Sequence, residues 1–300
     1  MAFSDNFKSE YKDLAGCLFY STLRRGEQEL SRETLYSVLK PFFYARATLN
    51  CAFRKCGYST PRPEFLRVQK PARAERRLRA NAYLNHLVDF FQDRLTDERW
   101  SQNCRVEGLD YLQSARGAGR PVILAFCHFG PFLLLRSILR AKGVPAAMLG
   151  SGEKPAPSRL RRLLDRRALL QEVPLRFYTG RLREADDFLA AGNVLCMPID
   201  APVSKHISVP FCESWTFEIA TGAVRLAVRH GADLIPCAVI DGGRWRFTVK
   251  LGEPVPRQFL SGKGDWFAAG KHLVDQLIPI FRAWPEQCRP DMIRCLKQNV

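Results

Sequence analysis

Residues 121–127 read Pro-Val-Ile-Leu-Ala-Phe-Cys, and residues 128–131 continue as His-Phe-Gly-Pro. The first seven residues are a short, uninterrupted apolar run, with Gly119 and Arg120 before it and a turn sequence after it. Such a run is typical of a strand that is buried on both faces of a sheet. The residues that follow, 132–142, are predicted to form a helix that ends at Gly143.

The chain repeats this alternation further on, which predicts an α/β fold: a central, mainly parallel sheet flanked by helices, with an N-terminal helical region packed on it. Further strands are expected at 146–149, 173–178, 193–198, 233–239 and 244–251. Further helices are expected at 158–170, 181–191, 217–229 and 271–284. Before the first strand, residues 1–60 and 71–95 have helical periodicity. We divide the chain into an N-terminal helical region at 1–70, possibly able to associate with a membrane, and an α/β domain at 71–300.

The charge of the chain favours an acidic partner. Lysine and arginine outnumber aspartate and glutamate by 46 to 30, a formal net charge of +16. A surplus of this size suits nucleic acid, anionic lipid or an acidic carrier protein. The sequence has no zinc finger, no aromatic RNA-binding signature and no helix-turn-helix pattern, so nucleic acid is not expected. It also lacks a P-loop, a dinucleotide fingerprint and the GxSxG motif of hydrolases.

The cysteines and the apolar runs bear on where the protein works. None of the 10 cysteines forms a CxxC pair or lies at zinc-binding spacing from a histidine, and several fall inside apolar runs. We therefore expect reduced thiols that pack in the core, and a cytoplasmic location. No apolar run approaches the roughly 20 residues that span a bilayer. The aromatic and basic residues at 35–53 suit a helix that lies in the membrane interface, with a buried helix as the alternative.

Two titratable residues follow strands of the expected sheet. His128 comes after the strand at 121–127, and Asp200 comes after the strand at 193–198. Ligands of parallel sheets gather at the carboxyl ends of the strands. A carboxylate that fixes the tautomer of an imidazole would make a general base of this pair. A structural hydrogen bond by a lone histidine is the alternative.

An ordered set of short motifs resembles a known family. The set comprises Arg105-Val-Glu-Gly-Leu-Asp-Tyr-Leu112, Gly119-Arg-Pro-Val-Ile-Leu124, His128-Phe-Gly130, Asp200, Val209-Pro-Phe211, Thr221-Gly222 and Gly231-Ala-Asp-Leu-Ile-Pro236. In order and spacing it is similar to the bacterial lipid A late acyltransferases (lauroyl or myristoyl acyltransferases), within the lysophospholipid acyltransferase superfamily. The resemblance covers roughly residues 30–255.

The resemblance implies that His128 deprotonates an acceptor hydroxyl, which then attacks an acyl thioester of acyl carrier protein or coenzyme A. The family has an acidic residue five positions after the histidine, where this chain has Leu133. Loss of the orienting carboxylate costs about ten-thousandfold in rate in a Ser-His-Asp triad. Either Asp200 supplies the carboxylate, which we favour, or the mechanism is altered, or the protein binds acyl carrier protein or lipid without catalysis. Glu153, Glu213 and Glu218 are weaker substitutes.

Substrate-binding roles are expected for five further residues. Gly130 shapes the turn after His128, where amides at the start of the next helix could hold an oxyanion. Arg161 and Arg162, in a very basic helix, could face lipid phosphates or an acidic carrier protein. Thr221 and Arg225 lie one helical turn apart, in a helix that the resemblance places beside the site.

The expected activity is transfer of a fatty acyl chain from an acyl thioester to a hydroxyl or amine of a lipid or lipid-like acceptor. The expected partners are acyl carrier protein or acyl-coenzyme A, an anionic membrane surface and the acceptor. The reaction needs no metal or bound cofactor. The sequence shows no evident membrane anchor, unlike the usual family member. We therefore expect either that residues 14–53 bind the protein reversibly to the cytoplasmic face of the inner membrane, or that its acceptor is soluble.

Overall fold

The structure is a computed structural model of the 300-residue chain. It describes residues 41, 62–67, 102–150, 176–178, 182–201, 205–243, 246–261 and 265–299. The helices expected at 1–60, 71–95 and 158–170 lie almost wholly outside these ranges, as do Arg161 and Arg162. Within the described residues, no helix is both long and apolar enough to cross a membrane.

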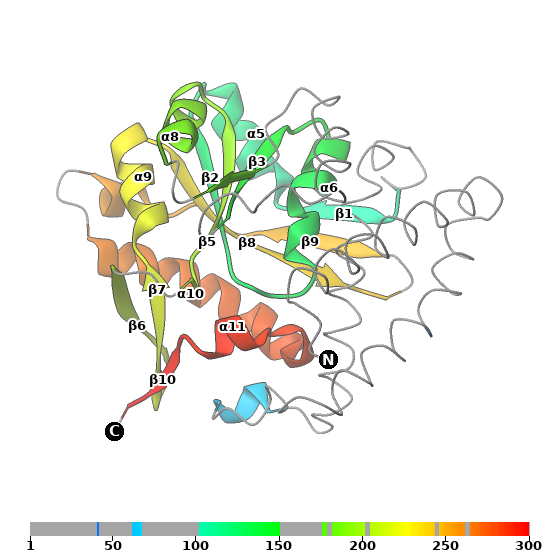
Figure 1. The fold of residues 1–300 in the computed structure, drawn as a ribbon, viewed down its shortest axis with the longest axis vertical. Coiled ribbons are helices and arrows are strands. Elements are labelled where there is room, and N and C mark those ends of the chain that lie inside the picture. The colour runs from blue at the N-terminus through cyan, green and yellow to red at the C-terminus, as the bar shows by residue number, and fades with distance from the viewer. Residues whose placement is uncertain are drawn as a thin grey trace, which may run out of the picture.

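A seven-stranded sheet forms the centre of the fold and confirms the α/β prediction (Figure 1). Its strands lie in the order β1-β9-β8-β2-β5-β3-β4. They are β1 (Cys104–Glu107), β9 (Phe247–Leu251), β8 (Asp233–Asp241), β2 (Val122–Phe126), β5 (Val194–Pro198), β3 (Ala146–Gly150) and β4 (Arg176–Tyr178). The five strands from β8 to β4 are mutually parallel. Strand β9 runs antiparallel to β8, and β1 runs parallel to β9, so the two strands at that edge are reversed.

Successive side chains of the central strands pack on opposite faces of the sheet, because the side-chain period of a strand is two. In β2, Ile123 and Ala125 join one apolar cluster, whereas Val122, Leu124 and Phe126 join another. Every residue of β2 is buried, which is why the apolar run at 121–127 is continuous rather than alternating.

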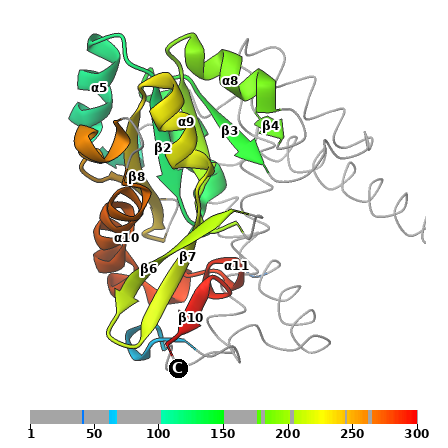
Figure 2. The ribbon, with the colours of Figure 1, turned by 90° about the vertical axis from the view of Figure 1, so that its left-hand side faces the viewer.

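Helices cover both faces of the sheet (Figures 1 and 2). The apolar side chains of α5 (Leu109–Gly117) and α6 (Leu135–Ala141) join the cluster that contains Leu124. Those of α8 (Leu182–Ala190), α9 (Gly222–His230) and α10 (Trp266–Ala283) join the cluster that contains Ile123. Helix α10 begins where the Asp265 side chain accepts a hydrogen bond from the Ala268 amide, at 2.9 Å. Short 3-10 helices lie at Glu64–Leu66, Phe132–Leu134, Arg257–Leu260 and Pro285–Gln287.

A second, three-stranded sheet was not expected from the sequence. It has the order β10-β7-β6, formed by β6 (His206–Cys212), β7 (Trp215–Ala220) and β10 (Leu296–Gln298). The helix expected at 217–229 is therefore wrong in its first part, where β7 lies. Phe217 and Ile219 are buried while Thr216 and Glu218 are only partly so, an alternation of period two that favours a strand. The helix itself starts only at Gly222.

The end of the chain returns to the carboxyl edge of the main sheet. After α10 come α11 (Pro290–Ile293) and then β10, which pairs with β7 (Figure 2). On the way, Phe129 and Cys288 form an isolated antiparallel bridge. The segment that follows β2 is therefore joined through its main chain to a segment about 160 residues later in the sequence.

Candidate active site

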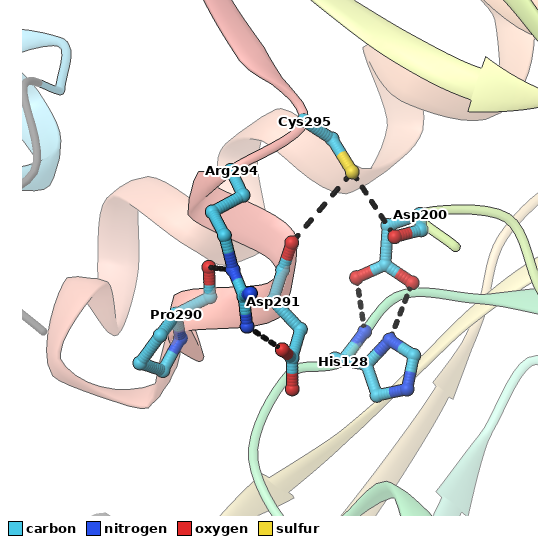
Figure 3. A network of polar contacts seen from close by, with 6 residues as sticks. All are labelled: His128, Asp200, Pro290, Asp291, Arg294 and Cys295. Atoms are coloured by element: carbon cyan, nitrogen blue, oxygen red, sulfur yellow. Dashed lines mark hydrogen bonds and ion pairs between the residues drawn. The ribbon is translucent and has the colours of Figure 1, made fainter. Parts of the chain in front are cut away.

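His128 and Asp200 lie side by side at the carboxyl edge of the main sheet (Figure 3). Strands β2 and β5 are neighbours, and their last residues, Phe126 and Pro198, are partners in register. His128 and Asp200 each follow their strand by two residues, so the parallel pairing brings them level. The Ile199 amide donates to the Phe126 carbonyl at 2.8 Å, which continues the ladder beyond β5.

The Asp200 carboxylate accepts two hydrogen bonds from His128. One oxygen accepts the main-chain amide of His128 at 2.6 Å, and the other lies 2.8 Å from its ring Nδ1. Asp200 is fully buried, whereas 24% of the His128 side chain is exposed. Because a carboxylate only accepts hydrogen bonds, Nδ1 carries the proton, and Nε2 is left as the acceptor on the far side of the ring.

The surroundings of His128 favour its protonated form. Burial of the imidazole acts to lower its pKa. The hydrogen bond and the charge of Asp200 act in the opposite sense, helped by Asp291, and the pKa of His128 is raised overall. The positive charge of Arg289 lowers it in part. The pair therefore makes a stronger base than a free histidine, which suits general-base chemistry.

Aromatic rings flank the imidazole. The ring of Phe132 meets it edge-on, with centroids 4.8 Å apart, and the ring of Phe126 lies 6.4 Å away. Both phenylalanines belong to the apolar cluster on one face of the sheet. Apolar walls of this kind limit the access of water and strengthen the electrostatic interaction between His128 and Asp200.

The position of Asp200 is held from the opposite side by Cys295. Its thiol lies 3.0 Å from the Asp200 carbonyl oxygen, to which it donates (Figure 3). Burial raises the pKa of the Cys295 thiol to about 12, so the proton needed for this bond stays in place at neutral pH. Cys295 is one of the site residues that sequence reasoning missed.

The segment 287–289 fixes the turn that carries His128. The Arg289 amide donates to the His128 carbonyl at 3.1 Å, and the Gly130 amide donates to the Gln287 carbonyl at 2.9 Å. Sequence reasoning missed these residues as well. No local pattern marks Gln287 or Arg289 as partners of a residue about 160 positions earlier, since the contact exists only in the folded chain.

The backbone geometry of Gly130 explains the turn after His128. Its φ is +49°, and a Cβ there would lie 2.2 Å from the Val239 carbonyl oxygen, so only glycine fits this turn. Its amide donates to the Gln287 carbonyl at 2.9 Å. Gly130 therefore shapes the turn, and the oxyanion contact expected of amides at the start of the next helix stays a prediction.

The other expected substrate residues lie at different depths. Thr221 is buried at the start of α9, where its amide and hydroxyl donate to the Lys205 carbonyl at 3.2 and 3.4 Å. Arg225 is exposed one turn later. In the part of the chain that the structure describes, neither forms a hydrogen bond or ion pair with His128 or Asp200. Their roles remain predictions.

The alternative carboxylates are engaged elsewhere. Glu218 lies 3.8 Å from His206 and 3.6 Å from Lys297, on the second sheet. Glu213 is exposed in the turn between β6 and β7, and Glu153 lies outside the described residues. Leu133, at the position where the family has an acidic residue, packs against the apolar cluster that contains Phe126 and Phe132. Of the carboxylates considered, Asp200 is the one at hydrogen-bond distance from His128.

The described cysteines are free thiols, and all but Cys212 are buried. Cys127 precedes His128 and packs in the opposite apolar cluster from Phe126 and Phe132. Burial, with the charge of Asp200, raises the pKa of this thiol well above its usual value. Cys127 is therefore an inert core residue rather than a nucleophile.

Comparison with known proteins identifies one family. The family model described as bacterial lipid A biosynthesis acyltransferase matches residues 85–259, more than half of the chain. The match includes His128, Asp200 and the five central parallel strands. It does not include the segment 285–298. A search of curated proteins found no matching relative.

Proposed function

Because this chain belongs to the bacterial lipid A biosynthesis acyltransferase family, we propose that it moves a fatty acyl chain from a thioester to a hydroxyl or amine of a lipid or lipid-like acceptor. The donor is acyl carrier protein or coenzyme A. The observation that supports this most is the double hydrogen bond between His128 and Asp200 at the carboxyl edge of the sheet.

The proposed reaction is a direct acyl exchange. His128 Nε2 takes the proton of the acceptor hydroxyl as its oxygen bonds to the thioester carbonyl carbon, and the carbonyl electrons move onto its oxygen. The intermediate collapses, the carbon–oxygen double bond re-forms and the carbon–sulfur bond breaks. The leaving thiolate takes the proton from His128, which returns the neutral imidazole.

Asp200 and Cys127 bear on two parts of this scheme, the base and the route of the acyl group. Asp200 holds Nδ1 protonated and stabilises the imidazolium while Nε2 carries the acceptor's proton. A covalent acyl-cysteine intermediate is not part of the proposal, because the thiol of Cys127 is buried and protonated. The bond changes need only proton transfer and acyl exchange, so the proposal includes no metal or bound cofactor.

The place of action follows from the family and the charge. Lipid A acyltransferases act on lipid acceptors, which suggests association with a membrane. We propose peripheral binding on the cytoplasmic face of the inner membrane, where the net charge of +16 would attract anionic lipid. The same charge would favour an acidic carrier protein as the donor, and nucleic acid is not part of the proposal.

The test is acceptor-dependent release of free thiol from a panel of acyl-carrier-protein and acyl-coenzyme A thioesters, with bacterial lipid extract as the acceptor. We expect His128→Ala to abolish release and Asp200→Asn to lower kcat by about ten-thousandfold, as in a triad that has lost its orienting carboxylate. The acylated lipid is identified by mass spectrometry.

The chain contains a matched control pair. His230 Nε2 lies 2.9 Å from the Asp186 carboxylate, in helices α9 and α8. His230→Ala and Asp186→Asn remove the same chemical groups, but His230 is at the end of α9 that is farther from His128. We therefore expect these variants to release nearly as much thiol as the wild type. If Asp200→Asn releases thiol as fast as the wild type, the dyad is wrong. If wild type and His128→Ala are equally silent with every donor, the catalytic proposal fails and the non-catalytic alternative takes its place.

A further inference from the structure

Arg289 places a positive charge beside the imidazole. Its guanidinium carbon lies 5.2 Å from the centroid of the Phe132 ring, the same ring that meets the His128 imidazole at 4.8 Å. Its own main-chain amide donates to the His128 carbonyl. The residue is thus tied to the site both through its backbone and through its side chain.

The guanidinium has no carboxylate partner within the described chain. The nearest acidic residue in sequence, Asp291, forms an ion pair with Arg294 instead (Figure 3). Asp200 has both carboxylate oxygens occupied by His128. Arg289 is partly buried, and burial lowers its pKa, although Asp291 and Asp200 act in the opposite sense. A partly buried cation on an aromatic face, whose guanidinium has no hydrogen-bond partner among the described residues, is suited to receive an anion.

The reaction itself produces an anion at this place. Attack on the thioester moves negative charge onto the carbonyl oxygen, within reach of the group that takes the acceptor's proton. The Gly130 amide, in the turn after His128, donates to the Gln287 carbonyl and is not free to meet this charge. A positively charged side chain beside the imidazole could also meet this charge.

We propose that Arg289 is a catalytic residue that stabilises the oxyanion of the tetrahedral intermediate. The inference rests on the proposed acyl transfer. It assigns a chemical role to the segment that lies outside the region matched by the family. The carbonyl oxygen is neutral in the thioester and carries a full negative charge only in the tetrahedral intermediate. The guanidinium therefore binds the transition state more tightly than the ground state.

The test compares Arg289→Gln and Arg289→Lys in steady-state transfer. Loss of an oxyanion donor lowers kcat by about 10²–10³-fold, with KM for donor and acceptor little changed. We expect that loss for Arg289→Gln, and recovery of most of it in Arg289→Lys, which keeps the charge. Lys297→Gln, which removes an exposed positive charge from β10, is the control and is expected to match the wild type.

A second measurement separates this role from a structural one and from the proposed function. The groups that face His128 are Asp200, Asp291 and Arg289, and of these only Arg289 lowers its pKa. We expect the NMR titration midpoint of His128 to rise in Arg289→Gln and to stay near the wild-type value in Arg289→Lys. A midpoint that does not move overturns the inference whether or not turnover is seen. Unchanged kcat, or a rise in KM alone, also overturns it and leaves the transferase proposal standing.

Discussion

The side chain of Gln287 forms two hydrogen bonds with the main chain of Asp241. The Asp241 amide donates to Oε1 at 3.0 Å, and Nε2 donates to the Asp241 carbonyl at 3.1 Å. Both residues are buried. The pair fastens the segment before α11 to the end of strand β8, next to the turn that carries His128. It acts as a substitute strand contact on the side of β8 where the pairing with β2 has ended, while Phe247 of β9 pairs with Asp241 on the other side.

Replacement of Gln287 by leucine is expected to destabilise the protein by about 2–4 kcal/mol, because two buried main-chain groups lose their partners. Activity per folded molecule should also fall, since the main chain of Gln287 holds Gly130. Urea unfolding and transfer assays measure the two effects. Gln258→Leu, at an exposed position, is the control, and equal stability of the two variants would contradict the bonding described here.

The turn at Gly130 provides a second prediction. Gly130→Ala puts a methyl group 2.2 Å from a main-chain oxygen at positive φ, and we expect a loss of about 3 kcal/mol or more, together with loss of activity. Gly143 also has positive φ, but a Cβ there meets nothing within 4 Å. Gly143→Ala should therefore cost only about 1–2 kcal/mol and leave kcat unchanged. Thermal unfolding compares the two, and equal losses would refute the steric argument.

The raised pKa of His128 has opposite consequences for activity and stability. A general base works when neutral, so kcat/KM should rise with pH through a midpoint above the ordinary value of 6.5. The protonated imidazole stabilises the fold, and that stability is complete below the ordinary pKa and is lost as pH rises through the raised one. Asp200→Asn removes the group that raises the pKa, so burial should dominate and move the residual midpoint downward. A midpoint that moves upward would contradict this account.

Two arginines form ion pairs with Asp233, and we expect its replacement to affect stability but not activity. Arg120 lies 2.9 Å and Arg257 2.5 Å from the Asp233 carboxylate, which is nearly buried at the start of β8. Asp233→Asn is expected to cost roughly 1–3 kcal/mol, because two cations lose a shielded partner. The site is at the other edge of the sheet, so kcat should not change. A large fall in kcat at full folding would show coupling across the sheet.

The sequence predicted the parts of the fold that local pattern controls. Val122 to Phe126 form a fully buried strand, as their apolar run indicated, and the mainly parallel sheet with helices on both faces follows from the alternation of strands and helices. The pairing of His128 with Asp200 could be anticipated, because parallel strands end at one edge. The hairpin of β6 and β7 was missed, since the helical residues that follow Gly222 masked a short alternating strand at Trp215–Ala220.

The contributions of Gln287, Arg289 and Cys295 could not be found in the same way. Each acts on the site through a contact that spans about 95 residues or more, from Cys295 to Asp200 and from the Gln287 segment to Gly130. No periodicity or motif spacing encodes such a contact. Such a contact depends on how α10 packs on the sheet, because this packing sets the position of the residues that follow the helix.

The bridge between Phe129 and Cys288 has a consequence for biosynthesis. The ribosome makes His128 and Asp200 long before it makes residues 285–298, so a nascent chain can assemble the parallel strands while the turn at Gly130 still lacks its partners. The sheet edge that carries His128 is completed only when the late segment has emerged and docked. The order of synthesis thus places the complete surroundings of His128 among the last parts of the molecule to form.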